Sequence, residues 1–223
     1  MAEKEGLNIK DDQQDGLYSE KAYLFLKKMI LEMKISPKEP LSESKLASLI
    51  GMSRTPVREA LKRLKNENIV ISSDKKGYFL NIPTGKEIKD LYELRAILEG
   101  AAVKLATQKI DFVQLENFEK KFLLYKNGLS NGDGTEDGFV NLGREFHFFI
   151  IESAQNEKLK ELLMGIYDQL EISRVYSYDK RRREAVDEHL KIVSALKERD
   201  QARGEAAMQE HLGNAFQVLI KIL

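Results

Sequence analysis

Three histidines could bind a metal ion, and they are the only histidines in the chain: His147, His189 and His211. Each falls on a different predicted helix in the C-terminal part of the sequence. Three imidazoles that leave one coordination position open suit zinc, with nickel as the alternative divalent ion. A single histidine on an apolar helix is more often a buried core residue than a ligand. The residues alone therefore leave two interpretations, a metal site and a metal-free polar pocket.

Basic side chains gather at the start of a short predicted helix near the N-terminus. Arg54, Thr55 and Arg58 occupy its first turns, and Lys62 follows on the outward side. The first residues of a helix that enters the major groove meet base edges, where an arginine can donate two hydrogen bonds to one guanine. A lysine at the periphery contacts phosphates without reading the sequence. The pattern indicates sequence-specific DNA binding.

A predicted β-hairpin with a basic tip follows this helix. Two runs of strand-forming residues, 69–71 and 78–80, flank a polar stretch that ends in Lys75, Lys76 and Gly77. The lysines can reach a phosphate or the minor groove, and the glycine permits a close approach of the backbone. The alternative is a hairpin that only covers a helical core. Because both the helix and the hairpin carry basic groups at their tips, DNA contact is favoured.

Charge is distributed unevenly along the 223 residues, although the net charge is zero. Residues 17–81 carry 13 Lys or Arg against 7 Asp or Glu, a net charge of +6, which indicates a polyanionic partner. The sequence lacks the run of about 18 apolar residues that a membrane span needs, and the polar residues 1–16 do not form a secretory signal. The absence of cysteine excludes disulfides and thiolate metal sites and fits a cytoplasmic protein.

Local signals mark the helices that carry the basic residues. A first helix is expected from an N-cap at Ser19 to just before Ser36, which precedes a proline. A second helix over 43–50 follows a capping serine and ends at Gly51, and a third runs over 53–67 with a proline in its first turn. Two helices joined by a short turn with glycine form a helix-turn-helix. With the hairpin, they predict a winged helix-turn-helix domain.

The sequence divides into a flexible N-terminal arm, 1–16, a DNA-binding domain, 17–81, and a helical domain, 82–223. From residue 84 onward helical periodicity continues without strand signals. Six helices are expected there, which predicts an all-α antiparallel bundle and a mainly α fold class. Their expected ranges are 84–105, 111–126, 138–154, 157–177, 181–197 and 200–223.

The first helix of this bundle is expected to start with a capping box made by Thr84 and Glu87. The residues expected on its buried apolar face are Leu91, Leu94, Ile97, Leu98, Ala101 and Leu105. Arg95 lies among them, and a guanidinium in apolar surroundings needs a partner. That partner is either an anionic effector, typically a carboxylate, or Glu99, which lies four residues on at helical pairing distance.

The stretch LSESKLASLIGMSRTPVREALKRLKNENIV, with KKGYFL after it, resembles the N-terminal domain of GntR-type regulators. The hallmark run SRTPVREAL is unbroken over Ser53–Leu61. The resemblance implies that Arg54, Thr55 and Arg58 contact DNA and that Gly77 marks the wing.

Three positions depart from the residues common in that family. Ser44 and Lys76 stand where arginines are common, which implies fewer or weaker phosphate contacts. Asn68 stands where glycine is common, and asparagine still tolerates a left-handed backbone.

The C-terminal part resembles the FadR-type ligand-binding domain of the same family. The residues that carry this likeness are Leu91–Arg95, Leu98–Glu99, Phe146–His147, Asn156, Leu159, Glu188–His189, Ile192, Asp200 and His211–Leu212. In the metal-binding relatives an Asp and three His hold a divalent ion, and the three histidines here fall at those positions. Gly143 stands where the Asp is expected. The resemblance also assigns Arg95, Glu99 and Asn156 to the effector pocket.

These observations predict a GntR-type transcriptional regulator and not an enzyme. The expected partners are a palindromic DNA operator, a second copy of the chain and a small anionic metabolite, with a divalent metal as the cofactor. A hydrolytic metalloenzyme is the rival interpretation, but the sequence places no general base beside the histidines and no nucleophile motif. The third interpretation is a DNA-binding module whose second domain serves only for dimerisation.

Overall fold

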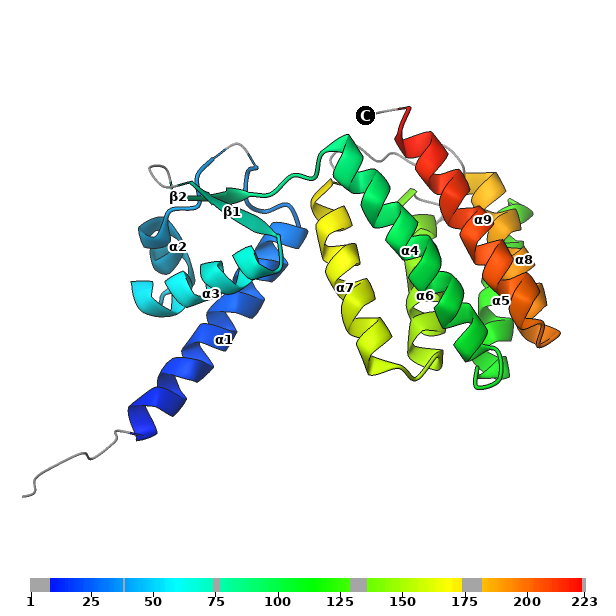
Figure 1. Ribbon diagram of the computed structural model, residues 1–223, viewed down its shortest axis with the longest axis horizontal. Helices are drawn as coiled ribbons and strands as arrows, with labels where there is room; N and C mark the ends of the chain where they lie inside the picture. The colour runs from blue at the N-terminus through cyan, green and yellow to red at the C-terminus, as the bar shows by residue number, and fades with distance from the viewer. Residues whose placement is uncertain (1–8, 38, 74–76, 129–135, 174–181, 222–223) are drawn as a thin grey trace, which may run out of the picture. The chain divides into compact units, whose positions relative to one another are not determined.

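The computed structural model describes residues 9–37, 39–73, 77–128, 136–173 and 182–221 (Figure 1). The chain divides into two compact units, Met1–Pro83 with Glu171–Ser173, and Thr84–Leu170 with Arg174–Leu223. Each unit has its own core of buried apolar side chains. No helix among the described residues combines the length and apolarity of a membrane span.

The first unit contains three helices and a two-stranded antiparallel sheet in the part of the chain that the structure describes (Figure 1). These elements are α1 (Ile9–Leu31), α2 (Glu43–Ile50), α3 (Arg54–Asn66), β1 (Val70–Ser73) and β2 (Gly77–Leu80). The order of elements is that of a winged helix-turn-helix, so the predicted fold class of this unit is confirmed.

The helix-turn-helix forms where local sequence signals place it. Ser42 accepts a hydrogen bond from the backbone N–H of Lys45 and caps α2, and Gly51 ends α2 with φ +68°. A left-handed residue at this position suits glycine, because a side chain would be strained there. Ser53 occupies the N-cap position of α3, but its side chain makes no capping hydrogen bond.

Helix α1 is longer than the sequence indicated. It begins at Ile9, so residues 9–16, expected in a flexible arm, are helical, and Ser19 lies inside the helix instead of capping it. The expectation relied on apolar periodicity, which starts only after Ser19. Polar residues such as Lys and Gln have good helix propensity without that periodicity. Residues 1–8 of the expected arm lie outside the described residues.

The hairpin lies beside the chain that enters α2. Its register pairs Val70 with Leu80 and Ser73 with Gly77. Leu41 forms a further antiparallel bridge with Tyr78, and the N–H of Leu41 donates to the Tyr78 carbonyl over 2.7 Å. Asn68, between α3 and β1, has φ +58°, so the expected left-handed backbone is confirmed.

The second unit is a bundle of six helices in its described part (Figure 1). They are α4 (Gly85–Ala106), α5 (Phe112–Lys126), α6 (Glu136–Ser153), α7 (Glu157–Ile172), α8 (Arg182–Lys197) and α9 (Gln201–Leu219). The predicted capping box is present, because Thr84 and Glu87 exchange backbone-to-side-chain hydrogen bonds. All six expected helices are found, and the predicted all-α class is confirmed.

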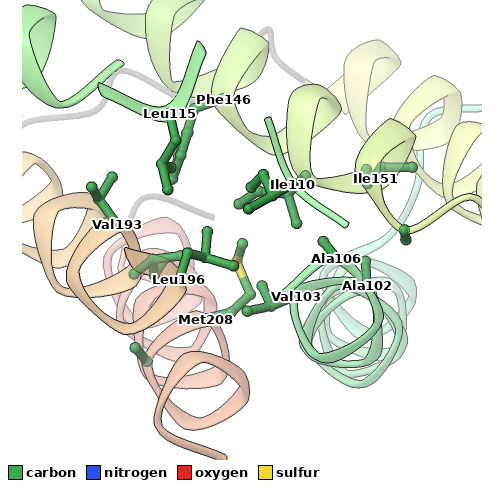
Figure 2. Close-up of a cluster of buried hydrophobic side chains, with 14 of the residues drawn as sticks. Ala102, Val103, Ala106, Ile110, Leu115, Phe146, Ile151, Val193, Leu196 and Met208 are labelled. Atoms are coloured by element: carbon green, nitrogen blue, oxygen red, sulfur yellow. The ribbon is translucent and has the colours of Figure 1, made fainter. Parts of the chain in front are cut away.

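The bundle core is built from aliphatic and aromatic side chains of several helices. Figure 2 shows Val103 of α4, Phe146 of α6 and Met208 of α9, all fully buried. Helix α9 packs tightly on α4 at Gly204, where an added Cβ would lie 2.7 Å from Cγ1 of Val103. Any side chain at position 204 would therefore force the two helices apart.

The apolar face expected for α4 is only partly correct, because Leu98 and Ala101 pack against the bundle core and three others do not. Leu94 and Ile97 are 50% and 60% exposed, and Leu105 is also exposed. The buried positions of α4 are instead Ile88, Glu99, Gly100, Ala102, Val103 and Ala106. Small residues and a paired carboxylate lie inside because neighbouring helices approach α4 closely, whereas the larger aliphatic residues form a separate stripe.

Candidate DNA interface and metal centre

The N-terminal end of α3 presents the candidate DNA-reading residues. Arg54, Thr55 and Arg58 are exposed, whereas the opposite face of α3 packs Val57 and Leu61 into the core. This division follows from the helical spacing of the apolar residues. The structure therefore brings the three residues to one outward surface, as a recognition helix requires.

Arg58 is held in place by an acidic residue of α2. Its Nε donates to both carboxylate oxygens of Glu43, at 3.0 and 3.1 Å, and its NH2 group donates to Oε2 at 2.8 Å. The hydrogen bond from Arg58 lowers the pKa of Glu43, although burial opposes the shift. Glu43 was not assigned a role from the sequence, because the two residues come together only when α2 packs on α3.

The other basic residues of α3 differ in their contacts. Lys62 is exposed and pairs with Glu59 over 2.8 Å. Arg63 pairs with Glu20, and its guanidinium carbon lies 3.6 Å from the centre of the Tyr23 ring. Arg63 therefore binds α1, and its positive charge is already partnered.

The wing of the candidate interface is described only in part. Gly77 begins β2 with φ +85°, a left-handed backbone that favours glycine. Lys75 and Lys76, the predicted phosphate contacts at the tip, lie outside the described residues.

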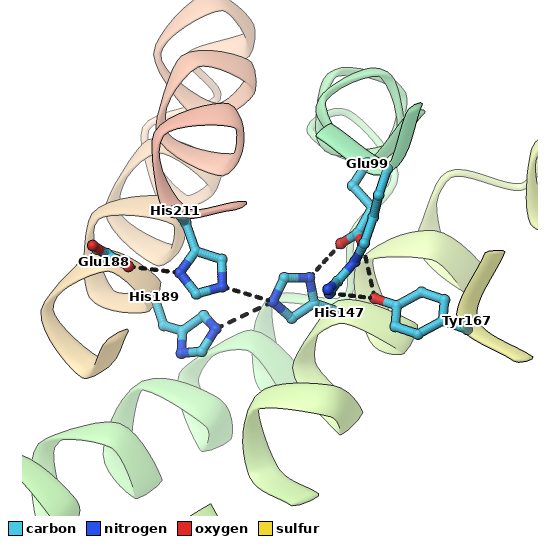
Figure 3. A network of polar contacts seen from close by, with 7 residues as sticks. Glu99, His147, Tyr167, Glu188, His189 and His211 are labelled. Atoms are coloured by element: carbon cyan, nitrogen blue, oxygen red, sulfur yellow. Dashed lines mark hydrogen bonds and ion pairs between the residues drawn. The ribbon is translucent and has the colours of Figure 1, made fainter. Parts of the chain in front are cut away.

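The three histidines meet in the interior of the second unit (Figure 3). His147 of α6, His189 of α8 and His211 of α9 are 3%, 3% and 7% exposed. Nε2 of His147 lies 3.2 Å from Nε2 of His189 and 3.2 Å from Nε2 of His211. One ligand atom from each residue lies within 4.8 Å of the others. The sequence-based expectation that these residues converge is thus met.

Buried carboxylates orient two of these imidazoles. Nδ1 of His211 donates to Oε2 of Glu188 over 2.8 Å, and Nδ1 of His147 donates to Oε2 of Glu99 (Figure 3). Asn214 holds the second oxygen of Glu188 at 2.8 Å. A proton fixed on Nδ1 leaves the lone pair of Nε2 facing the shared centre, which is how carboxylates orient metal-binding histidines.

The surroundings of His189 and His211 favour the neutral form of these two imidazoles. Burial lowers the pKa of His189 well below the ordinary value for histidine, and His211 and His147 lower it further. Burial also lowers the pKa of His211, although the hydrogen bond to Glu188 opposes the shift. Two neutral imidazoles whose Nε2 atoms meet can share a proton in a hydrogen bond or direct both lone pairs at a cation between them.

The donor set fits a divalent ion. A tetrahedral zinc with bonds of about 2.0–2.1 Å to nitrogen separates its ligand atoms by about 3.3 Å. The two Nε2 separations of 3.2 Å at His147 are close to that value. Neutral nitrogen ligands suit zinc and nickel better than calcium or magnesium, which prefer oxygen.

Arg95 and Glu99 of α4 form a buried ion pair beside His147. Nε of Arg95 donates to Oε1 of Glu99, and the hydroxyl of Tyr167 donates to the same oxygen over 2.8 Å. An NH2 group of Arg95 also lies 3.0 Å from the Tyr167 oxygen. Burial alone would raise the pKa of Glu99, but Arg95 and His147 outweigh it and hold the pKa below the ordinary range. Of the two partners that the sequence offered for Arg95, Glu99 is the one that binds it in the structure.

Tyr167 was missed in the sequence. Burial raises its pKa well above the ordinary value for tyrosine, so the hydroxyl keeps its proton and can donate to Glu99. A tyrosine within an apolar helical pattern was the available signal, because a buried hydroxyl needs a partner.

Two further sequence-predicted positions behave differently. Gly143 lies on α6 one turn before His147, and a Cβ added to it would lie 3.1 Å from Cε1 of His189. Glu145, two residues before His147, is exposed and offers no carboxylate to the histidines. Asn156 is also exposed, and its Oδ1 accepts a hydrogen bond from the N–H of Leu159 at the start of α7. The structure thus gives Asn156 a helix-capping contact and does not place it at the histidines.

A winged helix-turn-helix with outward arginines, joined to a helical domain with polar residues gathered in its core, defines a DNA-binding transcriptional regulator with a sensing domain. Residues 18–80 match the family model for bacterial regulatory proteins of the gntR family, and residues 90–214 match the FCD domain. The chain belongs to the GntR family of transcriptional regulators, with an FCD effector-binding domain. This family is not a class of enzymes.

Two relatives agree with this assignment, and one solved structure has a similar fold. The chain is 31% identical over 195 residues to the HTH-type transcriptional regulator YdhC of Bacillus subtilis (strain 168), covering 86% of this chain and 85% of YdhC. It is 31% identical over 195 residues to the Nta operon transcriptional regulator of Aminobacter aminovorans, covering 87% and 91%. The fold is similar to E. coli McbR/YncC, with a TM-score of 0.71 and 21% identity over 92% of this chain and 97% of that one.

Proposed function

We propose that this protein is a homodimer that binds a palindromic operator through α3 of each subunit, under the control of a small anionic metabolite. The exposure of Arg54, Thr55 and Arg58 at the N-terminal end of α3 carries this proposal. These residues read bases, and Lys62 contacts phosphate. On the wing, Lys75, Lys76 and Gly77 approach the DNA backbone. A two-fold dimer matches two half-sites of opposite orientation.

Selection of duplexes from a random library, followed by gel shifts at low salt, tests operator binding. We expect an enriched palindrome whose affinity falls as salt rises, because phosphate contacts release counterions. If no specific duplex is retained at any low salt concentration, operator binding is wrong.

The exposed stripe on α4 supports the dimer. Leu94, Ile97 and Leu105 share one face of the helix, since their helical angles fall close together. Contiguous apolar surface of this kind commonly marks a protein interface. We propose that α4 contacts a second copy of the chain through this stripe.

In the second unit, His147, His189 and His211 are proposed to hold a divalent metal, zinc with nickel as the alternative. The convergence of their Nε2 atoms and the carboxylates behind two of them support this role. When bound, the ion supplies a Lewis-acidic position for an anionic effector, typically a carboxylate. Elemental analysis of the purified protein tests the site, and metal-free protein after supplementation would favour the polar-pocket alternative.

The effector pocket is proposed to include Arg95 and Glu99, because their ion pair adjoins His147. The family resemblance also assigns Asn156 to the effector pocket. This proposal requires the effector to reach the exposed start of α7. Mass spectrometry of small molecules released from the purified protein identifies the effector class. An effector can change operator affinity only if it binds one arrangement of the two winged domains more tightly than another. The difference between its two binding free energies limits the size of the change.

A further inference from the structure

Gly143 leaves a position without a side chain beside His189, one of the three histidines. It precedes His147 by four residues on α6, so both positions lie on the same side of the helix. A Cβ built on Gly143 lies 3.1 Å from Cε1 and 3.8 Å from Nε2 of His189. A side chain here would point at the metal-binding nitrogens, and glycine provides no ligand atom at that point.

The charges around this position do not balance once a divalent cation is present. Arg95 and Glu99 cancel each other as a buried ion pair, and the three imidazoles are neutral ligands. Glu188, held by His211 and Asn214, contributes one negative charge. A charge of +2 added to this set leaves a net charge of +1 in a buried place. An uncompensated buried charge is costly, and one further negative charge would neutralise it.

We propose that the site binds a divalent metal and a monocarboxylate as an interdependent pair, with the carboxylate at the position that Gly143 leaves open. This inference rests on the proposed metal site and adds its regulation. The protein supplies three neutral nitrogen ligands, and the small molecule supplies the negatively charged oxygen ligand. Neither partner alone satisfies both the coordination and the charge of the site.

Interdependence has a definite thermodynamic form. If the carboxylate raises the affinity for the metal by some factor, the metal raises the affinity for the carboxylate by the same factor. The sensing domain then responds to the simultaneous presence of both species. A carboxylate side chain at position 143 would remove this dependence, because the protein itself would supply the missing charge and ligand atom.

A metal titration of the full-length chain tests the proposal. Zinc affinity is measured by competition with a chromophoric chelator, without additive and with acetate, acetamide or sodium chloride. We expect acetate to raise the affinity about tenfold or more, within the usual range of coupling between sites, and acetamide and chloride to have no such effect. Acetate also binds free zinc weakly, which lowers the apparent affinity, so solution chemistry cannot account for an increase.

Substitutions at position 143 isolate the missing carboxylate. We expect Gly143→Asp to bind zinc more tightly than wild type without acetate and to lose the acetate effect. Gly143→Asn, which has the same size without the charge, should show no such gain. Gly143→Ala measures the cost of the Cβ near His189. The absorption spectrum of the cobalt-substituted protein should change with acetate in wild type and not in Gly143→Asp.

The outcomes separate the inference from the function on which it rests. Equal zinc affinity with and without acetate overturns the interdependence and leaves the metal site intact. A gain in Gly143→Asn equal to that in Gly143→Asp overturns the charge argument. If the wild type binds no zinc under any condition, the metal site and this inference both fail, whereas operator binding is tested separately by gel shift. If Gly143→Asp does not fold, the wild-type titration decides.

Discussion

The carboxylate of Glu43 on α2 binds the guanidinium of Arg58 on α3 through three hydrogen bonds of 2.8 to 3.1 Å. Glu43 thereby occupies the Nε side of the guanidinium. Helix α2 thus orients Arg58, one of the arginines of α3 proposed to contact operator bases. A planar, bidentate pair of this kind restricts orientation more than a lysine contact could.

Replacing Glu43 by Gln is therefore expected to reduce discrimination between operators. Arg58 loses its orienting charge, and an acidic group near the phosphates disappears. We expect the affinity for scrambled duplex to rise slightly, while the ratio of operator to scrambled affinity falls about tenfold. Fluorescence anisotropy with both duplexes measures this ratio. An unchanged ratio would show that Glu43 does not position Arg58.

Arg54 and Lys62 provide a matched pair of substitutions on α3. Arg54→Ala should cost about 1–3 kcal/mol and relax the preference at one base pair, because it removes a base contact. Lys62→Ala should weaken operator and scrambled duplexes alike and reduce the salt slope by about one. Affinity measured against salt for single-base operator variants distinguishes the two. Identical salt slopes and specificity in the two variants would contradict these assignments.

Glu188→Gln is expected to weaken metal binding about 10–100-fold, the usual effect of removing a carboxylate behind a histidine ligand. The variant keeps the size of the side chain, so the bundle should remain folded. Chelator competition measures the affinity, and the circular dichroism spectrum is the control. Lys191→Ala, on the exposed side of α8, should leave metal affinity unchanged. Wild-type affinity in Glu188→Gln would contradict a role of this carboxylate at the metal.

Ile97→Glu is expected to dissociate the proposed dimer. The side chain is 60% exposed on α4, so the substitution should cost little in the folded subunit, but it would bury charge in the dimer. Sedimentation equilibrium measures the association, and Lys120→Glu on the exposed side of α5 controls for added negative charge away from the stripe. A dimer of unchanged affinity would place the interface elsewhere.

The parts of the fold that were predicted correctly depend on local signals. The bounds of α2 follow from Ser42 and Gly51, whose backbone roles are set by their immediate neighbours. The predicted start of the first helix at Ser19 was wrong, because α1 begins at Ile9, where helix formation does not follow the apolar pattern. The buried face of α4 was only partly correct because the pattern identifies apolar residues such as Leu94 and does not say which of them a neighbouring helix covers.

The sequence predicted which residues form the candidate metal site. It did not predict the hydrogen bonds that connect them to Tyr167 and Glu188. The convergence of the histidines was implied by the resemblance to the metal-binding relatives, whose ligand positions the three residues occupy. The contacts from Glu99 to His147 and from Tyr167 to Glu99 join residues 48 and 68 positions apart. Such contacts depend on the relative rotation of packed helices, which the sequence pattern does not determine. The sequence showed that Gly143 replaces an expected ligand. That a side chain at this position would face His189 follows only from the packing of α6 on α8.

The depth of the histidine cluster has a kinetic consequence. His147, His189 and His211 are almost wholly inaccessible to solvent and come from three separate helices. If the proposed ion binds there, we expect its exchange to need a local opening of these helices and to be limited by the rate of that opening. A site of this kind averages over brief fluctuations in metal supply. We therefore expect the metal-bound state of the proposed site to persist after the metal concentration falls, for a time set by the local opening of the bundle.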